Sequence, residues 1–157
     1  MAAAPVGGAF AFSSVLTPFF LGTVGGSLAA ERVPPGIAAG DPIASWINPT
    51  SITSGFLAVA TTAYLAAVYL TLDARRERDP ALAEAFRRKA LASGVVTGAL
   101  AVVEPAVLAA DAPRLFRQLL TLPALPFAVL SVAAGLASLV LMWRRSFLTV
   151  RVSAALD

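Results

Sequence analysis

The sequence contains no cysteine and no histidine. These absences exclude disulfide bonds, thiolate and histidine metal sites, and histidine ligation of haem iron within this chain. The soft ligands that remain are Met1, at the terminus, and Met142, close to the end of an apolar run. We therefore expect the chain itself to bind no metal and no haem, and any redox centre that works with it to lie mainly on another subunit.

The sequence motifs of common enzyme classes are missing as well. The chain has no Walker-type phosphate loop, no dinucleotide-binding GxGxxG, no HExxH and no nucleophile elbow. None of its apolar runs carries several charged residues, as a voltage sensor or an ion-coupled transporter usually does. We therefore predict no catalytic residue in this chain.

Charged residues are scarce, at 13% of the chain, whereas soluble domains usually contain about 25%. Hydrophobic residues make up 58%, and the mean hydropathy is +0.80. A membrane-spanning helix needs roughly 17–25 mostly apolar residues, and the uncharged gaps in this chain are long enough. The composition predicts an all-α integral membrane protein with one transmembrane domain over residues 1–157.

Four apolar runs are long enough to cross a bilayer, at residues 9–30, 49–72, 90–110 and 124–143. Six Lys and Arg residues lie in the loop 73–89 and three follow Trp143, whereas the first and third loops contain one and two. Because basic residues are enriched on the cytoplasmic side, we expect an up–down bundle of four helices with both termini and the charged loop 73–89 in the cytoplasm. The net charge of +3 follows this topology and does not indicate nucleic-acid binding.

The second run begins with a distinct start signal. Trp46 belongs at the level of the lipid headgroups, Asn48 can cap a helix, and Pro49 suits the first helical position. The run then carries hydroxyl groups along one stripe at helical spacing, at Thr50, Ser54, Thr61 and Tyr64. The stripe is typical of hydrogen bonding between helices, and a lining for quinone, protons or water is the alternative.

Small residues recur four positions apart in two of the runs. Gly22 and Gly26 form such a pair in the first run, and Gly94 and Gly98 form another in the third. Small residues at this spacing allow a second helix to approach closely, so both pairs are predicted packing surfaces.

Two charged features leave their roles open. Glu104 is an acidic residue inside an apolar run, and an acid within the membrane is a candidate for proton handling. Pro105 follows it, so a bend that brings Glu104 to the membrane interface is the alternative. Similarly, the loop 73–89 either docks a cytoplasmic partner or anionic lipid, or is only a solvated determinant of topology.

Several stretches together resemble subunit II of cytochrome bd-type quinol oxidases, including the cyanide-insensitive branch. They are SSVLTPFFLGTVGGSLAAERVP, DPIASWINPTSITSGFLAVATTAYLAAVYLTLDARR, DPALAEAFRRKALASGVVTGAL, DAPRLFRQLL and the run that ends in MWRRSF. The most specific element is W-x-N-P at Trp46, Asn48 and Pro49, followed by an apolar run that contains glycine. The resemblance covers nearly the whole chain.

The resemblance implies a membrane subunit of a terminal oxidase that oxidises quinol and reduces dioxygen to water. In that family, haems b and d reside in subunit I, and subunit II supports the assembly and stability of that haem-bearing partner. The implied location is the bacterial cytoplasmic membrane, in contact with lipid and quinol, with a quinone and a proton path as further roles. A chain without histidine fits this division of labour.

The chain also departs from that family. Family members have about twice as many spans, and their acidic elements of the GFDFG and DGNEVW type are missing here. We therefore expect an internal fragment that forms part of a larger bundle, and no proton-channel residue can be carried over. Two alternatives remain, namely a membrane scaffold and a small multi-span transporter or half-transporter. In the transporter, Glu104 and the hydroxyl stripe would line the path.

Overall fold

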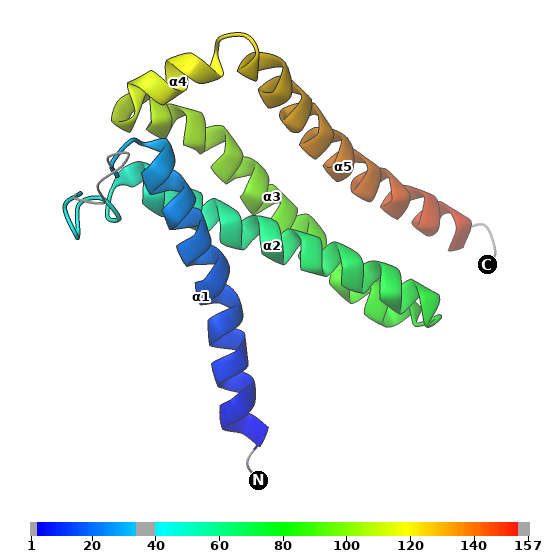
Figure 1. The fold of residues 1–157 in the computed structure, drawn as a ribbon. Helices are drawn as coiled ribbons and strands as arrows, with labels where there is room; N and C mark the ends of the chain where they lie inside the picture. The colour runs from blue at the N-terminus through cyan, green and yellow to red at the C-terminus, as the bar shows by residue number, and fades with distance from the viewer. Residues whose placement is uncertain (1–2, 34–39, 154–157) are drawn as a thin grey trace.

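The computed structural model describes residues 3–33 and 40–153, and this part of the chain contains helices and no strand. The helices are α1 (Ala3–Ala29), α2 (Pro49–Arg76), α3 (Pro80–Asp111), α4 (Pro113–Leu119) and α5 (Ala124–Ser153). Figure 1 shows that the long helices α1, α2, α3 and α5 alternate in direction and that the short α4 lies across one end. The predicted all-α membrane fold is confirmed.

Side-chain caps set the start of the two central helices. The side chain of Asn48 accepts a hydrogen bond from the backbone N–H of Ser51 at 2.9 Å, and Pro49 occupies the first turn. In the same way, Asp79 accepts from the backbone N–H of Leu82 at 2.9 Å, ahead of Pro80. Proline suits this position because its missing N–H would have had no helical partner.

The cap at Asp79 changes the interpretation of the charged segment 73–89. Most of the segment predicted as a loop is helical, because α2 continues to Arg76 and α3 already begins at Pro80. The connection between them is only the turn at residues 77–79, in which Arg78 has a left-handed φ of 58°. Alanine, leucine, glutamate and arginine after the cap are good helix formers, so the charged segment extends both helices instead of forming a loop.

Helices α2 and α3 form an antiparallel hairpin whose buried apolar side chains are alanines, with Leu108 as the exception. They are Ala60, Ala67 and Ala74 on α2, and Ala83, Ala90 and Leu108 on α3. Small side chains allow the two backbones to approach closely, which is the usual way in which helices associate within lipid.

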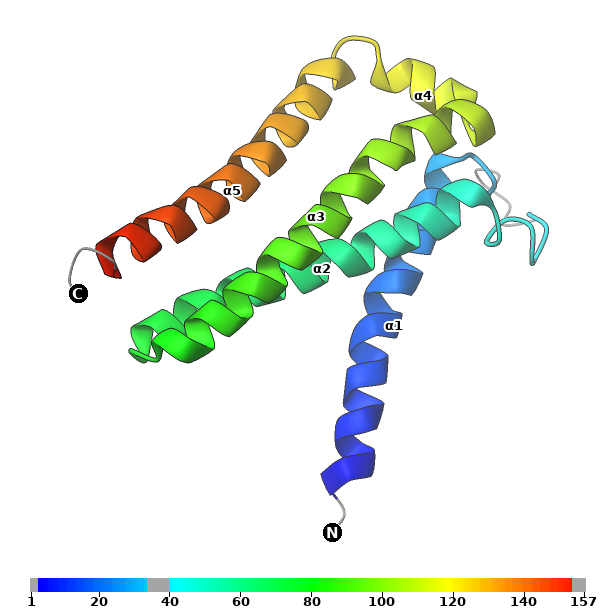
Figure 2. The ribbon, with the colours of Figure 1, turned by 180° about the vertical axis from the view of Figure 1, so that it is seen from behind.

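The outer helices are less enclosed than a closed bundle would require. Figures 1 and 2 show that α1 meets α2 near its C-terminal end and diverges from it toward the N-terminus. Helix α5 follows α4 and contacts the α2–α3 hairpin through the hydrogen bond between Tyr64 and Ser138, while its ribbon lies apart from the hairpin along much of its length in both views. Large apolar side chains therefore face outward on both helices, for example Phe10 and Phe127, which are 73% and 70% exposed. Such surfaces suit contact with lipid or with other membrane helices.

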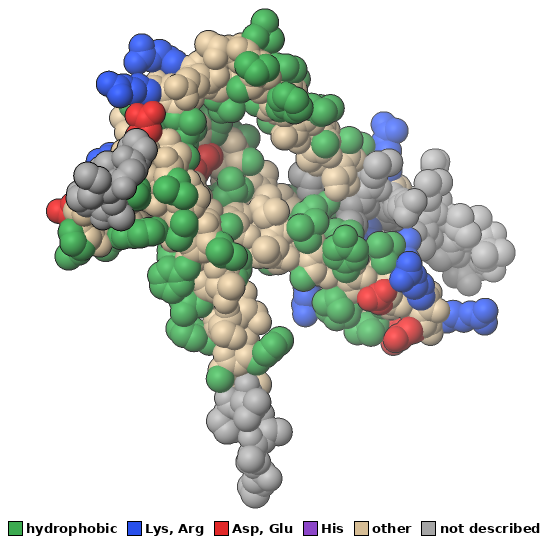
Figure 3. Space-filling model, viewed as in Figure 1, with side chains coloured by type: hydrophobic (Ala, Val, Ile, Leu, Met, Phe, Trp, Pro, Cys, Tyr) green, Lys and Arg blue, Asp and Glu red, His purple; other side chains and the backbone are tan. Residues whose placement is uncertain are grey.

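Within the described residues, three helices are long and apolar enough to cross a membrane, and α4 and α5 add a fourth crossing if they count as one bent span. The bend between Pro113–Leu119 and Ala124–Ser138 is 82°. Helix α3 has 32 residues and is therefore about 48 Å long at 1.5 Å per residue. A bilayer core is only about 30 Å thick, so the charged end of α3 must extend beyond it. The space-filling view agrees, since charged side chains gather at the ends of the helices (Figure 3).

Candidate functional site: a polar cluster between α1, α2 and α3

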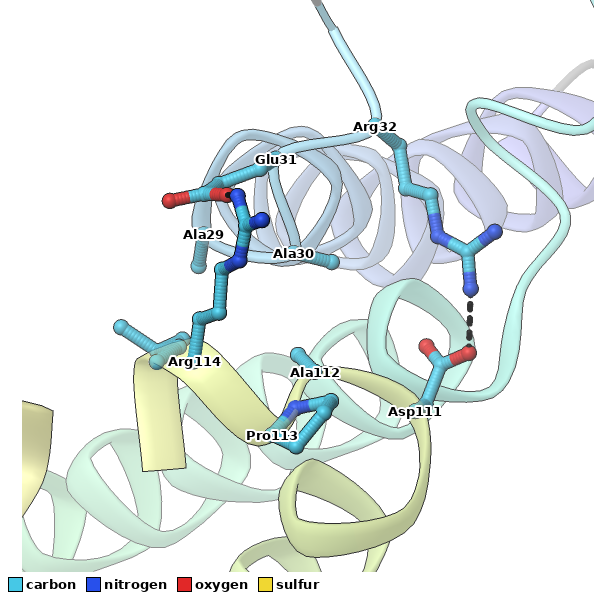
Figure 4. Close-up of a pocket in the computed structure, with 9 residues that line it drawn as sticks. Ala29, Ala30, Glu31, Arg32, Asp111, Ala112, Pro113 and Arg114 are labelled. Carbon is cyan, nitrogen blue, oxygen red and sulfur yellow. Dashed lines mark hydrogen bonds and ion pairs between the residues drawn. The ribbon is translucent and has the colours of Figure 1, made fainter. Parts of the chain in front are cut away.

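An ion pair joins three helices at the end of the molecule where α1 and α3 finish. Arg32, just after α1, donates to Asp111, the last residue of α3, as Figure 4 shows. Asp111 also accepts from the hydroxyl of Thr50 at 2.7 Å and from its backbone N–H at 3.3 Å. Because Thr50 lies in the first turn of α2, one carboxylate connects all three helix ends.

A second, more exposed pair lies beside the first. A guanidinium nitrogen of Arg114, in α4, is 3.6 Å from a carboxylate oxygen of Glu31. A cavity of ≈ 380 Å³ lies between the two pairs, bounded by residues 29–32 and 111–115. Its charged groups already oppose one another, so the cavity presents no net charge to a ligand.

Glu104 lies farther along the same face of α3. Its Oε1 accepts a hydrogen bond of 2.7 Å from the hydroxyl of Ser54, four residues after Thr50 on α2. The seven residues between Glu104 and Asp111 correspond to about 10 Å along the helix. The Glu104 side chain is half-buried, and the helix continues through Pro105 to Asp111. The two carboxylates are thus held by the two hydroxyls at successive turns of α2.

The other hydroxyls of the predicted stripe differ in their partners. Tyr64 hydrogen-bonds to Ser138 of α5, whereas Thr61 donates to the carbonyl of Leu57 in its own helix at 2.7 Å. Hydrogen bonds between helices therefore engage every member of the stripe except Thr61. These contacts match the interpretation of the stripe as a helix-packing feature, while a path lining stays a prediction.

The first glycine pair lies directly against α2. A Cβ added to Gly22 would lie 2.5 Å from the carbonyl oxygen of Ser54, and one on Gly26 would lie 2.7 Å from the Cα of Ser51. Neither distance leaves room for a side chain. The structure thus brings Gly22 and Gly26 together with the hydroxyl face of α2. On α3, Gly94 is buried and Gly98 is half-buried.

Comparison with known proteins adds the decisive observation. The family model for cytochrome bd terminal oxidase subunit II matches residues 4–156. The chain belongs to this family. No curated protein and no solved structure matched it.

In this subunit II chain, the W-x-N-P element forms the entry to α2. The side chain of Trp46 is 43% exposed, as expected for an indole at a membrane boundary, while Asn48 is buried and caps the helix. Pro49, exposed at the surface, begins the helix. Just before, Asp41 accepts from the backbone N–H groups of Ala44 and Ile43, and these bonds lower the pKa of the Asp41 carboxyl.

At the opposite end of the hairpin, the charged residues of this subunit form local pairs. Glu84 accepts from the guanidinium groups of Arg87 and Arg88 at 2.8 and 3.2 Å. The ammonium group of Lys89 lies 5.5 Å from the centre of the Phe86 ring. These contacts do not decide between a docking surface and a solvated helix end, and both interpretations stay predictions.

Sequence reasoning missed the Arg32–Asp111–Thr50 connection. Its components were visible, because Arg32 is the single basic residue of the first loop and Asp111 ends an apolar run. Their pairing across 79 positions depends on how α1 and α3 are placed by α2, which no local pattern encodes. Sequence reasoning also missed Ser51, which is fully buried with a hydroxyl that lacks a partner.

Proposed function

We propose that this chain is the non-haem membrane subunit of a bd-type terminal oxidase, whose complex oxidises quinol and reduces dioxygen to water. Its role is to support the assembly and stability of the haem-bearing subunit I. The observation that carries the proposal is the family match over residues 4–156.

The donor atoms of the chain do not fit haem binding. Histidine and cysteine are absent from the sequence, and the part of the chain that the structure describes contains no cluster of three acidic side chains that could hold a metal ion. The two carboxylates of α3 that contact α2 are already engaged, Asp111 by Arg32 and Thr50, and Glu104 by Ser54. We therefore assign haems b and d to the partner subunit and derive no electron-transfer step through this chain.

The open arrangement of α1 and α5 suits a subunit that packs against others. Their outward apolar surfaces are available to lipid and to the membrane helices of subunit I. A quinone can lie against such a surface within the complex. We place the chain in the bacterial cytoplasmic membrane, with the turn at residues 77–79 and both ends of the chain on the cytoplasmic side, because the basic residues are concentrated there.

Co-purification tests the proposal directly. The tagged chain should be purified from native membranes in mild detergent, and a reduced-minus-oxidised spectrum recorded. We expect a haem-bearing partner in stoichiometric amount and quinol oxidase activity in the purified complex. A chain that purifies alone and colourless, and that moves a solute across liposome membranes, would instead support the transporter alternative.

A further inference from the structure

The cavity at the end of α1, α3 and α4 is flanked by two ion pairs. Figure 4 shows Arg114 pointing toward Glu31 on one side and Arg32 pointing toward Asp111 on the other, with Ala30 and the start of α4 between them. Each cation therefore faces an anion across the cavity. A site with separated charges of both signs and no net charge is complementary to a ligand of the same kind, which is a zwitterion.

The two ion pairs differ in how firmly they are held. Asp111 is 11% exposed and also accepts from Thr50, so its bond with Arg32 is a fixed part of the fold. The nearest charged atoms of Glu31 and Arg114, by contrast, are 3.6 Å apart, and both side chains are more than half exposed. Exposed ion pairs contribute little to stability, because water competes for both partners. A ligand can therefore separate Glu31 from Arg114 and bind to both.

The backbone at the end of α1 fixes the charged residues on that side of the cavity. The N–H of Arg32 donates to the carbonyl of Ser27, and the N–H of Glu31 donates to the carbonyl of Leu28, both at 3.1 Å. Glu31 has a left-handed φ of 56° between them. These features form a Schellman motif, which ends a helix with a defined chain direction. Glu31 and Arg32 are thus placed before any ligand binds, which lowers the entropic cost of binding.

The cavity lies at the level of the lipid headgroups. Trp46, typical of a membrane boundary, precedes the start of α2, and Thr50 in the first turn of α2 binds Asp111 beside the cavity. Helix α4 lies at 82° to the first part of α5, exposes its two arginines and half-buries its leucines and phenylalanine. Such an amphipathic helix suits the surface of a bilayer. The zwitterions concentrated at this level are phospholipid headgroups.

We propose that this cavity binds the headgroup of a phospholipid that carries a phosphodiester and a primary ammonium group. The guanidinium of Arg114 donates to the phosphate oxygens, and the carboxylate of Glu31 accepts from the ammonium group. Arg32 is 41% exposed and uses Nη2 for Asp111, so its guanidinium has further N–H groups for the phosphate.

The size and the walls of the cavity suit this ligand. Its volume of ≈ 380 Å³ is at the lower end of the range for ligand pockets, which is about 300–1,000 Å³. Ala29, Ala30 and Leu115 add apolar surface for the carbon atoms between the charged groups. This inference goes beyond the proposed function and uses it only for the complex in which the site is tested.

Native mass spectrometry of the whole oxidase complex tests the site. The delipidated complex is titrated with phosphatidylethanolamine, phosphatidylglycerol and phosphatidylcholine that have identical acyl chains, and bound lipids are counted. We expect the wild type to prefer phosphatidylethanolamine, because phosphatidylglycerol has no ammonium group and the ammonium of phosphatidylcholine has no N–H. Glu31→Gln should weaken phosphatidylethanolamine binding about fivefold, the effect of one exposed ion pair, and leave phosphatidylglycerol unchanged. Arg114→Gln should weaken the binding of both lipids.

Arg117→Gln is the matched control. Arg117 is an exposed arginine of the same helix, donates to the carbonyl of Pro113 and lies outside the cavity lining, so this variant should bind lipid as the wild type does. Equal phosphatidylethanolamine binding by Glu31→Gln, Arg114→Gln and Arg117→Gln would overturn the site. Soluble phosphoethanolamine is the second probe. If it displaced the lipid at equal concentration, the ligand would be a free zwitterion and the lipid proposal would be wrong.

The haem spectrum of each preparation separates this inference from the proposed function. A complex with normal haem content and no preference for phosphatidylethanolamine rejects the lipid site and leaves the proposed function in place. A wild-type chain without a haem-bearing partner contradicts the proposed function, whereas a preference of that chain for phosphatidylethanolamine, lost in Glu31→Gln, would still support the site.

Discussion

Asp111 is the side chain on which three helix ends depend. It is 11% exposed and binds both Arg32 and Thr50. Replacing it by asparagine keeps the shape but removes the charge, so Arg32 loses its ion-pair partner. Hydrogen bonds to charged groups contribute about 1.5–3 kcal/mol, and we expect Asp111→Asn to lower the stability of the complex by an amount in that range. Thermal unfolding in detergent, followed by loss of the haem signal, measures this effect.

The neighbouring pair of Glu31 and Arg114 provides the control. Both side chains are more than half exposed, at 59% and 78%, and exposed ion pairs contribute about 0–1 kcal/mol. Glu31→Gln should therefore change the unfolding temperature little.

A double-mutant cycle on Arg32 and Asp111 would show whether the two side chains act together, and a coupling energy near zero would contradict the proposed connection.

At the scale of the element, the contact between α1 and α2 depends on glycine at particular positions. A Cβ on Gly26 would lie 2.7 Å from the Cα of Ser51 and 2.9 Å from the carbonyl oxygen of Thr50, both of which are backbone atoms. Neither can move without moving α2. We expect Gly26→Ala to separate the helices at a cost of about 1–3 kcal/mol and to lower the yield of assembled complex. Yield and unfolding temperature are the measurements.

Gly25 is a matched control on the same helix. Nothing lies within 4 Å of a Cβ added there, so Gly25→Ala meets open space. Alanine favours a helix over glycine by about 1 kcal/mol, and this variant should be neutral or slightly stabilising. If Gly25→Ala and Gly26→Ala lowered the yield of assembled complex equally, the loss would come from contact of α1 with a partner helix and not from its contact with α2.

These same elements show how far the sequence could predict the structure. The start of α2 at Asn48 and Pro49 was predictable, because caps and proline act within one turn. The glycine pair at Gly22 and Gly26 was recognisable, but its contact with Ser51 and Ser54 was not, because the rotation of one helix against another is set by tertiary packing. For the same reason, the bond between Ser54 and Glu104, 50 residues apart, appeared only in the structure.

At the scale of the whole molecule, the number of membrane crossings depends on α5. Helices α2 and α3 are antiparallel, so residues 41–48 and the turn at residues 77–79 lie at opposite ends of the 28-residue α2. That helix is about 42 Å long, which is enough to separate them across a bilayer. The side reached by α5 depends on whether the 82° bend after α4 directs it back through the membrane or along its surface.

The absence of native cysteine makes this question accessible to labelling with a membrane-impermeant maleimide. Ala44→Cys and Glu77→Cys place a thiol at exposed positions on either end of α2, and Arg144→Cys places one on α5. We expect Ala44→Cys to react in intact spheroplasts, and Glu77→Cys and Arg144→Cys to react only after the membrane is permeabilised. This pattern follows from the concentration of basic residues near positions 75–89 and after position 143. Reaction of Arg144→Cys together with Ala44→Cys would instead mean that α4 and α5 stay on the side of the membrane where Ala44 lies. The chain would then cross the membrane three times.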